Sequence, residues 1–371
     1  MKIETLAVHA GREIDSVTGA VQAPIQLSTT FRRDQDGELA SEFIYSRSGN
    51  PTRRSLEKCL ASLEEAAECA AFSSGMAVAN AVFQALEPGA HVIISDGYYG
   101  TGKMLVDVFT RWKVECSIVD TSDISAFRSA LRNNTQLVWI ESPTNPMIRV
   151  TDLAEVSALS HAAGAKVICD NTVPTAILQR PLDHGCDMSM YSATKFLSGH
   201  GDVLGGALVS KNNDEFFERV RLIQTSAGAV PSPFECWLTL RGIRTLPYRV
   251  RAHSENAMKV AMFLDSHPAI AGVNYPGLPK NKHHSVAKKQ MTMFGGLLSI
   301  HLKGGRDAAM QLAARVRLFT RATSLGGTES LIEHRASVEA PPAQTPEDLL
   351  RLSIGLEHPD DLIADLEQAL A

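Results

Sequence analysis

Short apolar runs alternate with helix-like segments across residues 91–210, and this alternation constrains the fold more than any other feature of the chain. The apolar runs read HVIISD, VECSIVD, LVWIES, KVICDN, DMSMYSA and GGALVS, and helical segments are predicted at 102–112 and 151–164. Apolar strands separated by helices are typical of a mostly parallel sheet that is covered by helices. The sequence therefore predicts an α/β domain with such a sheet.

Two further helices are predicted before these strands. Residues 52–70, TRRSLEKCLASLEEAAECA, place Leu56, Leu60 and Leu63 on one helical face. A second helix follows SSGM and runs through AVANAVFQAL until PGA stops it. The first 45 residues carry APIQLSTTF and little periodicity, so we expect an extended arm that packs on something larger.

The pattern of predicted strands and helices changes after a long helical stretch at 233–266. Strands GVNYPG, GGLLSIHL and LLRLSIGLE then alternate with helices at 306–317 and 360–370, which indicates a smaller α+β domain. A length of 371 residues also favours two domains, because a typical domain has about 150 residues. We therefore expect an N-terminal arm (1–45), a large domain (46–240) and a small C-terminal domain (241–371).

Charge and cysteine usage narrow the class of partner. The formal net charge is −5, whereas binding to nucleic acid or to an anionic membrane favours clustered positive charge, so a small-molecule substrate is the expectation. The N-terminus lacks the apolar core of a secretory signal, and the six scattered cysteines form no C-x-x-C pair. Reduced thiols in a cytoplasmic protein fit this pattern best. His200, His283 and His284 have no companion at metal-ligand spacing, so no metal site is expected.

The stretch YSATKFLSGHGD, at 191–202, places Lys195 among small, hydroxylated and apolar residues, with no acid before Asp202. An unpaired lysine is costly to bury, so one interpretation is that Lys195 points to solvent. The alternative is that it has a functional partner.

Strand ends supply such a partner, because ligands of doubly wound sheets gather at the carboxyl ends of the strands. KVICDN places Asp170 at one strand end, and MSMYSATK places Ser192, Thr194 and Lys195 at another. In SSGM, at 73–76, a glycine precedes a helix whose free N–H groups suit an anion. Pyridoxal 5′-phosphate (PLP) would use all of these groups: its phosphate needs N–H donors, its pyridine nitrogen a carboxylate and its aldehyde a lysine.

Each of these signals has a structural alternative. Asp170 could cap a turn, and SSGM could be an ordinary N-terminal capping sequence. The glycines of SGHGDVLGG could suggest a dinucleotide-binding loop, but such a loop opens a helix, and here GGALVS leads into another strand.

Nearly the whole chain resembles the cystathionine γ-synthase and γ-lyase family of sulfur amino-acid enzymes. The matching blocks are VHAG, STTF, YSRSGNPTR, SSGM, YYGT, ESPTNP, CDNT, YSATKFLSGHGDV, LRGIRTL, SLGGTESL and LLRLSIGLE. The resemblance implies a PLP-dependent transferase fold of the aspartate aminotransferase type (fold type I), with a mostly parallel sheet in the large domain.

The resemblance also implies how the cofactor is held. Lys195 would form the Schiff base with PLP, Asp170 would pair with the pyridine nitrogen, and Tyr99 would lie against the ring and help proton transfer. The phosphate would be bound by the backbone N–H groups of Gly75 and Met76 and the hydroxyls of Ser192 and Thr194.

For the substrate, the resemblance implies that Arg351 clamps the α-carboxylate, with Asn145 and Ser324 assisting. A guanidinium suits this task because its planar fork matches two oxygens. Tyr45 and Arg47 would reach the phosphate of a neighbouring subunit, which implies a dimer with shared sites and a homotetramer built from two dimers.

Departures from the family pattern concern the substrate. Members that act on cystathionine usually carry an acid directly before SLGG, where this chain has Thr323. The usual H-P-A-x-x-x-H pattern is also changed, because Arg335 replaces the proline and the second histidine is absent. Substrate range is therefore expected to differ from that of the common members.

The function implied is a PLP-dependent enzyme of transsulfuration. It would eliminate from cystathionine-like thioethers or replace the acyl group of an O-acylhomoserine by cysteine. Methionine γ-lyase, a β-eliminating cysteine or cystathionine lyase and a homoserine sulfhydrylase stay open as alternatives. A catalytically idle binding module is the alternative from another class, although such a module has no need for Lys195 and Asp170 together.

Overall fold

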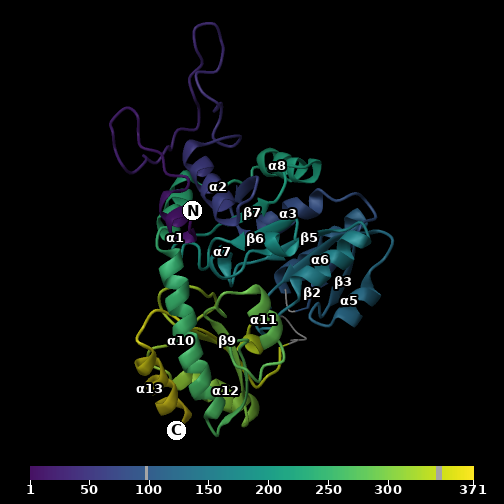
Figure 1. Ribbon diagram of the computed structural model, residues 1–371, viewed down its shortest axis with the longest axis vertical. Helices are drawn as coiled ribbons and strands as arrows, with labels where there is room; N and C mark the ends of the chain where they lie inside the picture. The colour runs from purple at the N-terminus through teal and green to yellow at the C-terminus, as the bar shows by residue number, and fades with distance from the viewer. Residues whose placement is uncertain (97–98, 340–344) are drawn as a thin grey trace.

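The described part of the chain forms two β-sheets, and in the view of the computed structural model in Figure 1 the seven-stranded sheet lies above the five-stranded one. The structure describes residues 1–96, 99–339 and 345–371. In the seven-stranded sheet the order is β1-β7-β6-β5-β4-β2-β3, and β7 runs antiparallel to both of its neighbours while the other adjacent pairs are parallel. This arrangement confirms the predicted α/β class. The strands are β1 (Glu68–Phe72), β2 (His91–Ser95), β3 (Glu115–Val119), β4 (Thr135–Glu141), β5 (Lys166–Asp170), β6 (Met188–Ser192) and β7 (Gly206–Ser210).

The central strands are apolar throughout because both faces of the large sheet are buried. Ile93 and Ile94 are neighbours in β2, yet they belong to different core clusters, since successive side chains of a strand point to opposite faces. Ile94 packs with α3, α4 and α8, and Ile93 packs with α5 and α6. The helices and turns of this region are α2 (Pro51–Glu64), α3 (Gly75–Gln84), α4 (Tyr99–Asp107), η1 (Phe109–Trp112), α5 (Ile124–Ala130), α6 (Leu153–Ala162), α7 (Thr175–Leu178), η2 (Pro181–His184) and α8 (Glu215–Ala227).

The second sheet lies after the long helix α10 and has the order β10-β11-β12-β9-β8. It is antiparallel except for the β10–β11 pair. Apolar side chains of α10, α12 and α13 pack against it in one core cluster. The elements are α9 (Pro233–Ile243), α10 (Leu246–Ser266), β8 (Ile270–Asn274), α11 (His284–Gln290), β9 (Leu297–Leu302), α12 (Gly305–Arg315), β10 (Thr320–Arg321), β11 (Leu331–Glu333), η3 (Arg335–Ser337), β12 (Leu349–Ser353) and α13 (Pro359–Leu370). The predicted domain boundary at 240/241 falls inside α9 and stays a prediction.

The N-terminal arm begins with a helix that the sequence analysis missed, α1 (Ile3–His9). Arg244 Nη1 donates to the carbonyl oxygens of Ala7 at 2.8 Å and Ala10 at 2.9 Å, so the helix is fixed by a residue far along the chain. Most of the remaining arm extends away from the body of the molecule (Figure 1).

The predicted helix at 52–70 was too long. It ends at Glu64, and Glu65 adopts a left-handed conformation with φ 53°. Residues Glu68–Phe72 instead form strand β1, which pairs with β7. Among the residues that the structure describes, no helix has the length and apolar character needed to cross a membrane.

Candidate active site

Two neighbouring parallel strands, β5 and β6, end at the centre of the candidate site. Asp170 is the last residue of β5 and is only 4% exposed, and Ser192 is the last residue of β6. Thr172 links the two ends: its N–H donates to Asp170 Oδ1 at 3.0 Å, and its Oγ1 accepts from the N–H of Ser192 at 2.8 Å. The acid and the hydroxyl are thus brought to the same edge of the sheet, as the sequence predicted from the strand ends.

Lys195 lies in the turn that follows β6. Its N–H donates to the Ser192 carbonyl at 3.2 Å and its carbonyl accepts from Gly199 N–H at 2.9 Å, so the backbone is fixed on both sides. The Nζ donates to Ser324 Oγ at 2.9 Å, and the side chain is half-buried rather than extended into solvent. Burial lowers the pKa of Lys195, and the charge of Arg351 lowers it further. A lowered pKa favours the neutral amine, which is the form that acts as a nucleophile or base.

A backbone cradle lies where β1 leads into α3. Ser74 caps the helix by accepting from Ala77 N–H at 3.1 Å, and the N–H groups of Gly75 and Met76 have no partner within the helix. A Cβ on Gly75 would lie 2.9 Å from Cε at the flexible end of Met190 and 3.4 Å from Ser192 Cβ, so the helix start lies directly against the strand end. Such a helix start is suited to a phosphate.

Thr194 and Gly206 lie beside this cradle. Thr194 Oγ1 accepts from the N–H of Gly205 at 3.0 Å, so this hydroxyl already has a backbone partner. Gly206, in β7, makes the close approach possible from the other side, because a Cβ there would lie 2.4 Å from the carbonyl oxygen of Ser74.

Arg351 comes from β12 of the second sheet and is only 2% exposed. Its Nη2 donates to the carbonyl of Ser324 and pairs with Glu333 Oε2, both at 2.7 Å. Its Nε is buried without a hydrogen-bond partner. Burial lowers the pKa of Arg351 to about 10. Ser324 has φ 110°, which is uncommon for a residue other than glycine, and it contacts both Lys195 and Arg351.

Asn145 lies in the loop after β4, close to the end of that strand. Its N–H donates to Glu141 Oε2 at 3.3 Å, and its Oδ1 is buried without a hydrogen-bond partner. Burial raises the pKa of Glu141, the last residue of β4, and the nearby charge of Asp170 raises it further. Sequence reasoning took Asn145 from the block ESPTNP and overlooked Glu141, although an acid at the end of an apolar strand was the signal that identified Asp170.

Glu333 and Arg335 also escaped assignment to the site. Glu333 is the last residue of β11, and its Oε1 accepts from Thr323 Oγ1 at 2.7 Å. Arg335 Nη1 lies 3.5 Å from Glu333 Oε2. The positions noted in the sequence as departures, Thr323 and Arg335, therefore meet at one carboxylate that also pairs with Arg351.

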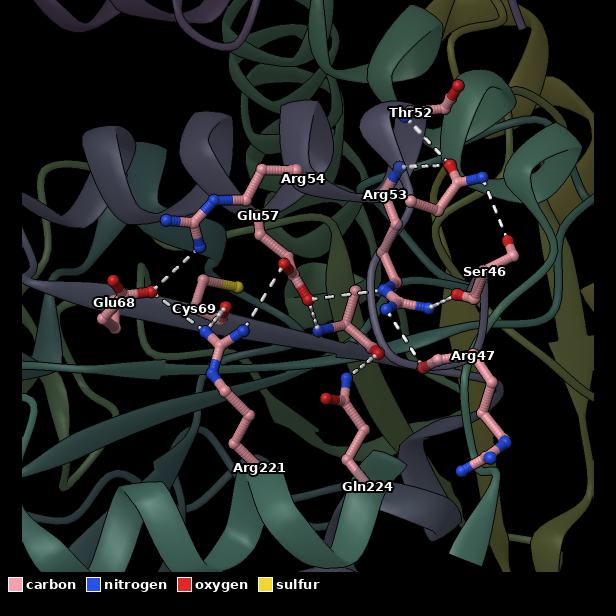
Figure 2. Close-up of polar contacts among 12 residues, drawn as sticks. Ser46, Arg47, Thr52, Arg53, Arg54, Glu57, Glu68, Cys69, Arg221 and Gln224 are labelled. Atoms are coloured by element: carbon pink, nitrogen blue, oxygen red, sulfur yellow. Dashed lines mark hydrogen bonds and ion pairs between the residues drawn. The ribbon is translucent and has the colours of Figure 1, made fainter. Parts of the chain in front are cut away.

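Tyr45 and Arg47 lie away from these contacts, in the loop before α2. Tyr45 is 44% exposed, and Arg47 Nη1 donates to the carbonyl of Thr225 in α8 at 2.7 Å. Figure 2 shows what fixes the loop: the buried Arg53 donates to the carbonyl oxygens of Ser46 at 2.9 Å and Arg47 at 3.2 Å. Glu57 lies 3.9 Å from Arg53 Nε and 3.7 Å from Arg221 Nη1, which ties α2 to α8.

Tyr99 begins α4, but its side chain lies outside the described part of the structure.

The residues present fit PLP. The cradle at Gly75 suits a phosphate, and Asp170 suits a pyridinium nitrogen. Asn145 Oδ1 and Arg351 Nε are buried without a hydrogen-bond partner, as expected of polar atoms that bind a ligand. Within the described residues, no group of three or more His, Cys, Asp or Glu side chains is arranged to hold a metal ion.

Comparison with known proteins shows the family of this chain. A family model described as Cys/Met metabolism PLP-dependent enzyme matches residues 4–371. The cystathionine gamma-synthase of Mycobacterium bovis is 47% identical over 373 residues, which cover 99% of this chain and 96% of that protein. The cystathionine gamma-lyase of Dictyostelium discoideum is 43% identical over 378 residues, with coverage of 100% and 97%. The crystal structure of metB from Corynebacterium glutamicum matches with a TM-score of 0.96 at 42% identity, covering 100% of this chain and 98% of that chain.

Proposed function

The chain belongs to the family of Cys/Met metabolism PLP-dependent enzymes, and on that premise we propose that it acts at the γ-carbon of an amino acid substituted there by sulfur or an acyloxy group. Its cofactor is PLP and its fold is the PLP-dependent transferase fold of the aspartate aminotransferase type, as the sequence predicted. Elimination from a cystathionine-like thioether and replacement on an O-acylhomoserine by cysteine share the same first steps. The observation that carries the proposal is the chain of contacts from Lys195 through Ser324 to Arg351.

That chain of contacts orients an α-amino acid. Glu333 occupies Nη2 of Arg351 and leaves Nε without a partner, so the open edge of the guanidinium can receive the α-carboxylate. The Lys195 amine bonds to Ser324 Oγ, and the backbone carbonyl of that same serine accepts from Arg351. A substrate held by its carboxylate therefore presents its α-carbon to the lysine.

Lys195 is the residue proposed to move protons. Its lowered pKa keeps a fraction of the amine neutral, so Nζ would remove the proton from the α-carbon, pass that proton on and, once neutral again, remove a proton from the β-carbon. When bound, PLP supplies an electron-accepting pyridine ring, which Asp170 would keep protonated. The cradle at Gly75 and Met76, together with the hydroxyls of Ser192 and Thr194, would hold the phosphate.

Loss of the γ-substituent completes the elimination. Breakdown with water then gives a 2-oxo acid and ammonia, whereas addition of a thiol gives a new thioether. Asn145 Oδ1, which is buried without a partner, would accept a hydrogen bond from the cofactor or the substrate amine.

A panel of substrates tests the proposed function. L-cystathionine, L-cysteine, L-methionine and O-acetyl- and O-succinyl-L-homoserine are incubated with the PLP-loaded enzyme, with and without cysteine. We expect 2-oxobutyrate from the γ-substituted substrates and thioether when cysteine is added. Pyruvate as the sole product would instead indicate a β-lyase, and no product from any substrate would overturn the proposal.

A shared site in a dimer is proposed on the position of Tyr45 and Arg47. Both are exposed on the outer side of this chain, and the arm before them exposes Ile14 (65%), Val17 (90%) and Leu27 (67%). Such apolar side chains suit contact with a second copy, and two dimers would form the tetramer that the resemblance implies.

All six cysteines are unpaired, which supports a cytoplasmic location.

Mixing inactive variants tests the shared site. Lys195→Ala chains and Arg47→Ala chains are unfolded, mixed and refolded together, so that some hybrid dimers hold one site with both functional groups. We expect partial recovery of activity. If hybrids form, as shown by mass spectrometry of the assembly, and no activity returns, the two residues do not serve a neighbouring subunit.

A further inference from the structure

Arg335 is a cation with less pairing than its burial requires. It begins the short turn η3 directly after β11, and its side chain is 16% exposed. Its Nε is buried without a hydrogen-bond partner. Carboxylate oxygens lie 3.5 Å from its Nη1 (Glu333) and 3.9 Å from its Nε (Glu339), and both distances are longer than a charge-assisted hydrogen bond. Burying a guanidinium in this way is unfavourable unless another anion completes its shell.

Both neighbouring carboxylates are already bound by other donors. Glu333 accepts from Thr323 on Oε1 and from Arg351 on Oε2, each at 2.7 Å. Glu339 accepts from the N–H of Thr345 at 3.1 Å and from the Thr345 hydroxyl. Neither acid is free to turn fully toward Arg335, so the guanidinium retains donors for a further ligand.

Arg335 also lies within the field of the active site. It shares Glu333 Oε2 with Arg351, so the two guanidinium groups are adjacent. Its charge lowers the pKa of both Lys195 and Arg351. The site therefore presents one guanidinium for an α-carboxylate and a second beside it.

We propose that Arg335 binds a second carboxylate at the far end of the substrate's γ-substituent, so that the enzyme prefers substrates with a distal carboxylate over those with a neutral acyl group. This inference rests on the proposed function and names its substrate class: a succinyl-type ester, or a thioether that ends in an amino acid, rather than an acetyl ester. Thr323 donates to Glu333 and carries no charge, so it does not attract or repel a distal carboxylate. Arg335 is therefore the residue that distinguishes the two substrate classes.

The test compares two substrates that differ in the distal carboxylate. Arg335→Met keeps the apolar stem and removes the guanidinium. We expect the ratio of kcat/KM for O-succinyl-L-homoserine to kcat/KM for O-acetyl-L-homoserine to fall about 10- to 100-fold, as for loss of a hydrogen bond to a charged group. Arg335→Lys should lose an intermediate amount on the succinyl ester, because a lysine keeps the charge but not the fork.

The control variant removes a positive charge elsewhere in the same sheet region. Arg306→Met, on α12, takes away a guanidinium that is 51% exposed and pairs with Glu347. It should leave the ratio of the two kcat/KM values unchanged. An equal loss on both esters in Arg335→Met, or a loss below about 2-fold on the succinyl ester, would overturn the inference.

A binding measurement separates this inference from the proposed function. L-2-aminosuberate carries a distal carboxylate and L-2-aminooctanoate does not, and neither has a leaving group at the γ-carbon. Dissociation constants by calorimetry should favour aminosuberate in the wild type and lose that preference in Arg335→Met, or in Arg335→Lys if the first variant does not fold. An absence of preference in the wild type would overturn the inference even if the substrate panel succeeds, and its presence would support the inference even if the panel fails.

Discussion

Two arginine–glutamate clusters in this molecule are built from the same side chains and differ in how completely they are paired. The α2 cluster comprises Arg53, Glu57, Glu68 and Arg221 (Figure 2), and the β12 cluster comprises Glu333, Arg335 and Arg351. In the described part of the chain, Nε atoms of Arg335 and Arg351 are buried without a hydrogen-bond partner, and no nitrogen of the α2 cluster is in that state.

The backbone explains the difference. Arg53 donates hydrogen bonds to the carbonyl oxygens of Ser46 and Arg47. Arg221 Nη2 donates to Glu68 Oε2 at 2.9 Å and to the Cys69 carbonyl at 2.6 Å. In the β12 cluster the carboxylate of Glu333 serves two guanidinium groups and a hydroxyl at once. A cluster saturated by its own backbone stabilises the fold, whereas one that lacks acceptors is ready to bind an anion.

The largest effect is expected where the β12 cluster meets the reacting atoms. Lys195→Ala removes the amine that bonds to Ser324, and we expect turnover to fall at least about 10³-fold, since proton transfer and the covalent link to PLP are both lost. Product formation measures the loss, and circular dichroism checks that the fold is retained. Lys58→Ala, which removes an exposed lysine paired with Glu13, is the matched control and should keep full turnover. Ordinary turnover in Lys195→Ala would exclude the catalytic role.

The next effect should fall on stability and be confined to the α2 cluster. Arg53→Met removes the donor to two backbone carbonyl groups and a buried partner of Glu57, so we expect a loss of about 3–5 kcal/mol in the free energy of unfolding. Denaturant titration measures it. Arg54→Met, whose pair with Glu68 is partly exposed, should cost no more than about 1 kcal/mol. Equal losses in the two variants would show that saturation by the backbone does not matter here.

A smaller effect on stability is expected in the β12 cluster. Arg335→Met leaves Glu333 with Thr323 and Arg351, so no carboxylate loses its last partner, and we expect a change below about 1 kcal/mol. The same denaturant titration gives the value beside that of Arg53→Met. A loss as large as that of Arg53→Met would place Arg335 with the structural arginines and erase the contrast between the clusters.

The smallest effect is a shift in pH dependence. Burial lowers the pKa of Lys195, Arg351 and Arg335 lower it further, and Glu333 raises it. An amine with a lowered pKa loses its proton at lower pH, so the base form persists further into the acid range. Removing the positive charge in Arg335→Met raises the pKa of Lys195, and the acid limb of the kcat profile should move to higher pH. Glu333→Gln removes a negative charge and should move that limb to lower pH, and shifts of the same sign in both variants would contradict this account.

Sequence reasoning succeeded where the controlling interactions are local. The central strands were recognisable because burial of both faces makes them apolar at every position, and Asp170 and Ser192 followed because strand ends gather at one edge. The positions of Asp170 and Ser192 could thus be inferred from the order of residues along single strands, and their roles toward PLP stay predictions.

Long-range pairing set the limit of that reasoning. Glu68–Phe72 were taken as the end of a helix because the preceding residues are good helix formers, and only pairing with β7, far along the chain, makes them a strand. Glu333 and Arg351 meet because β11 and β12 pair with these two residues opposite each other. That register is absent from either segment alone, so Thr323 and Arg335 could be noted as unusual but not placed around one carboxylate. The roles of Tyr45 and Arg47 stay predictions.

The contact between Lys195 and Ser324 also dictates when the enzyme becomes competent during its own synthesis. Ser324 lies 129 residues after Lys195, and Arg351 comes later still, in the last strand of the chain. At roughly 5–20 residues per second, a ribosome exposes the lysine on the order of ten seconds before its serine partner. A nascent chain that already contains all strands of the large sheet therefore has the amine but no guanidinium to orient a substrate. If Arg351 binds the substrate's α-carboxylate as proposed, this anchor is among the last parts of the site to be made.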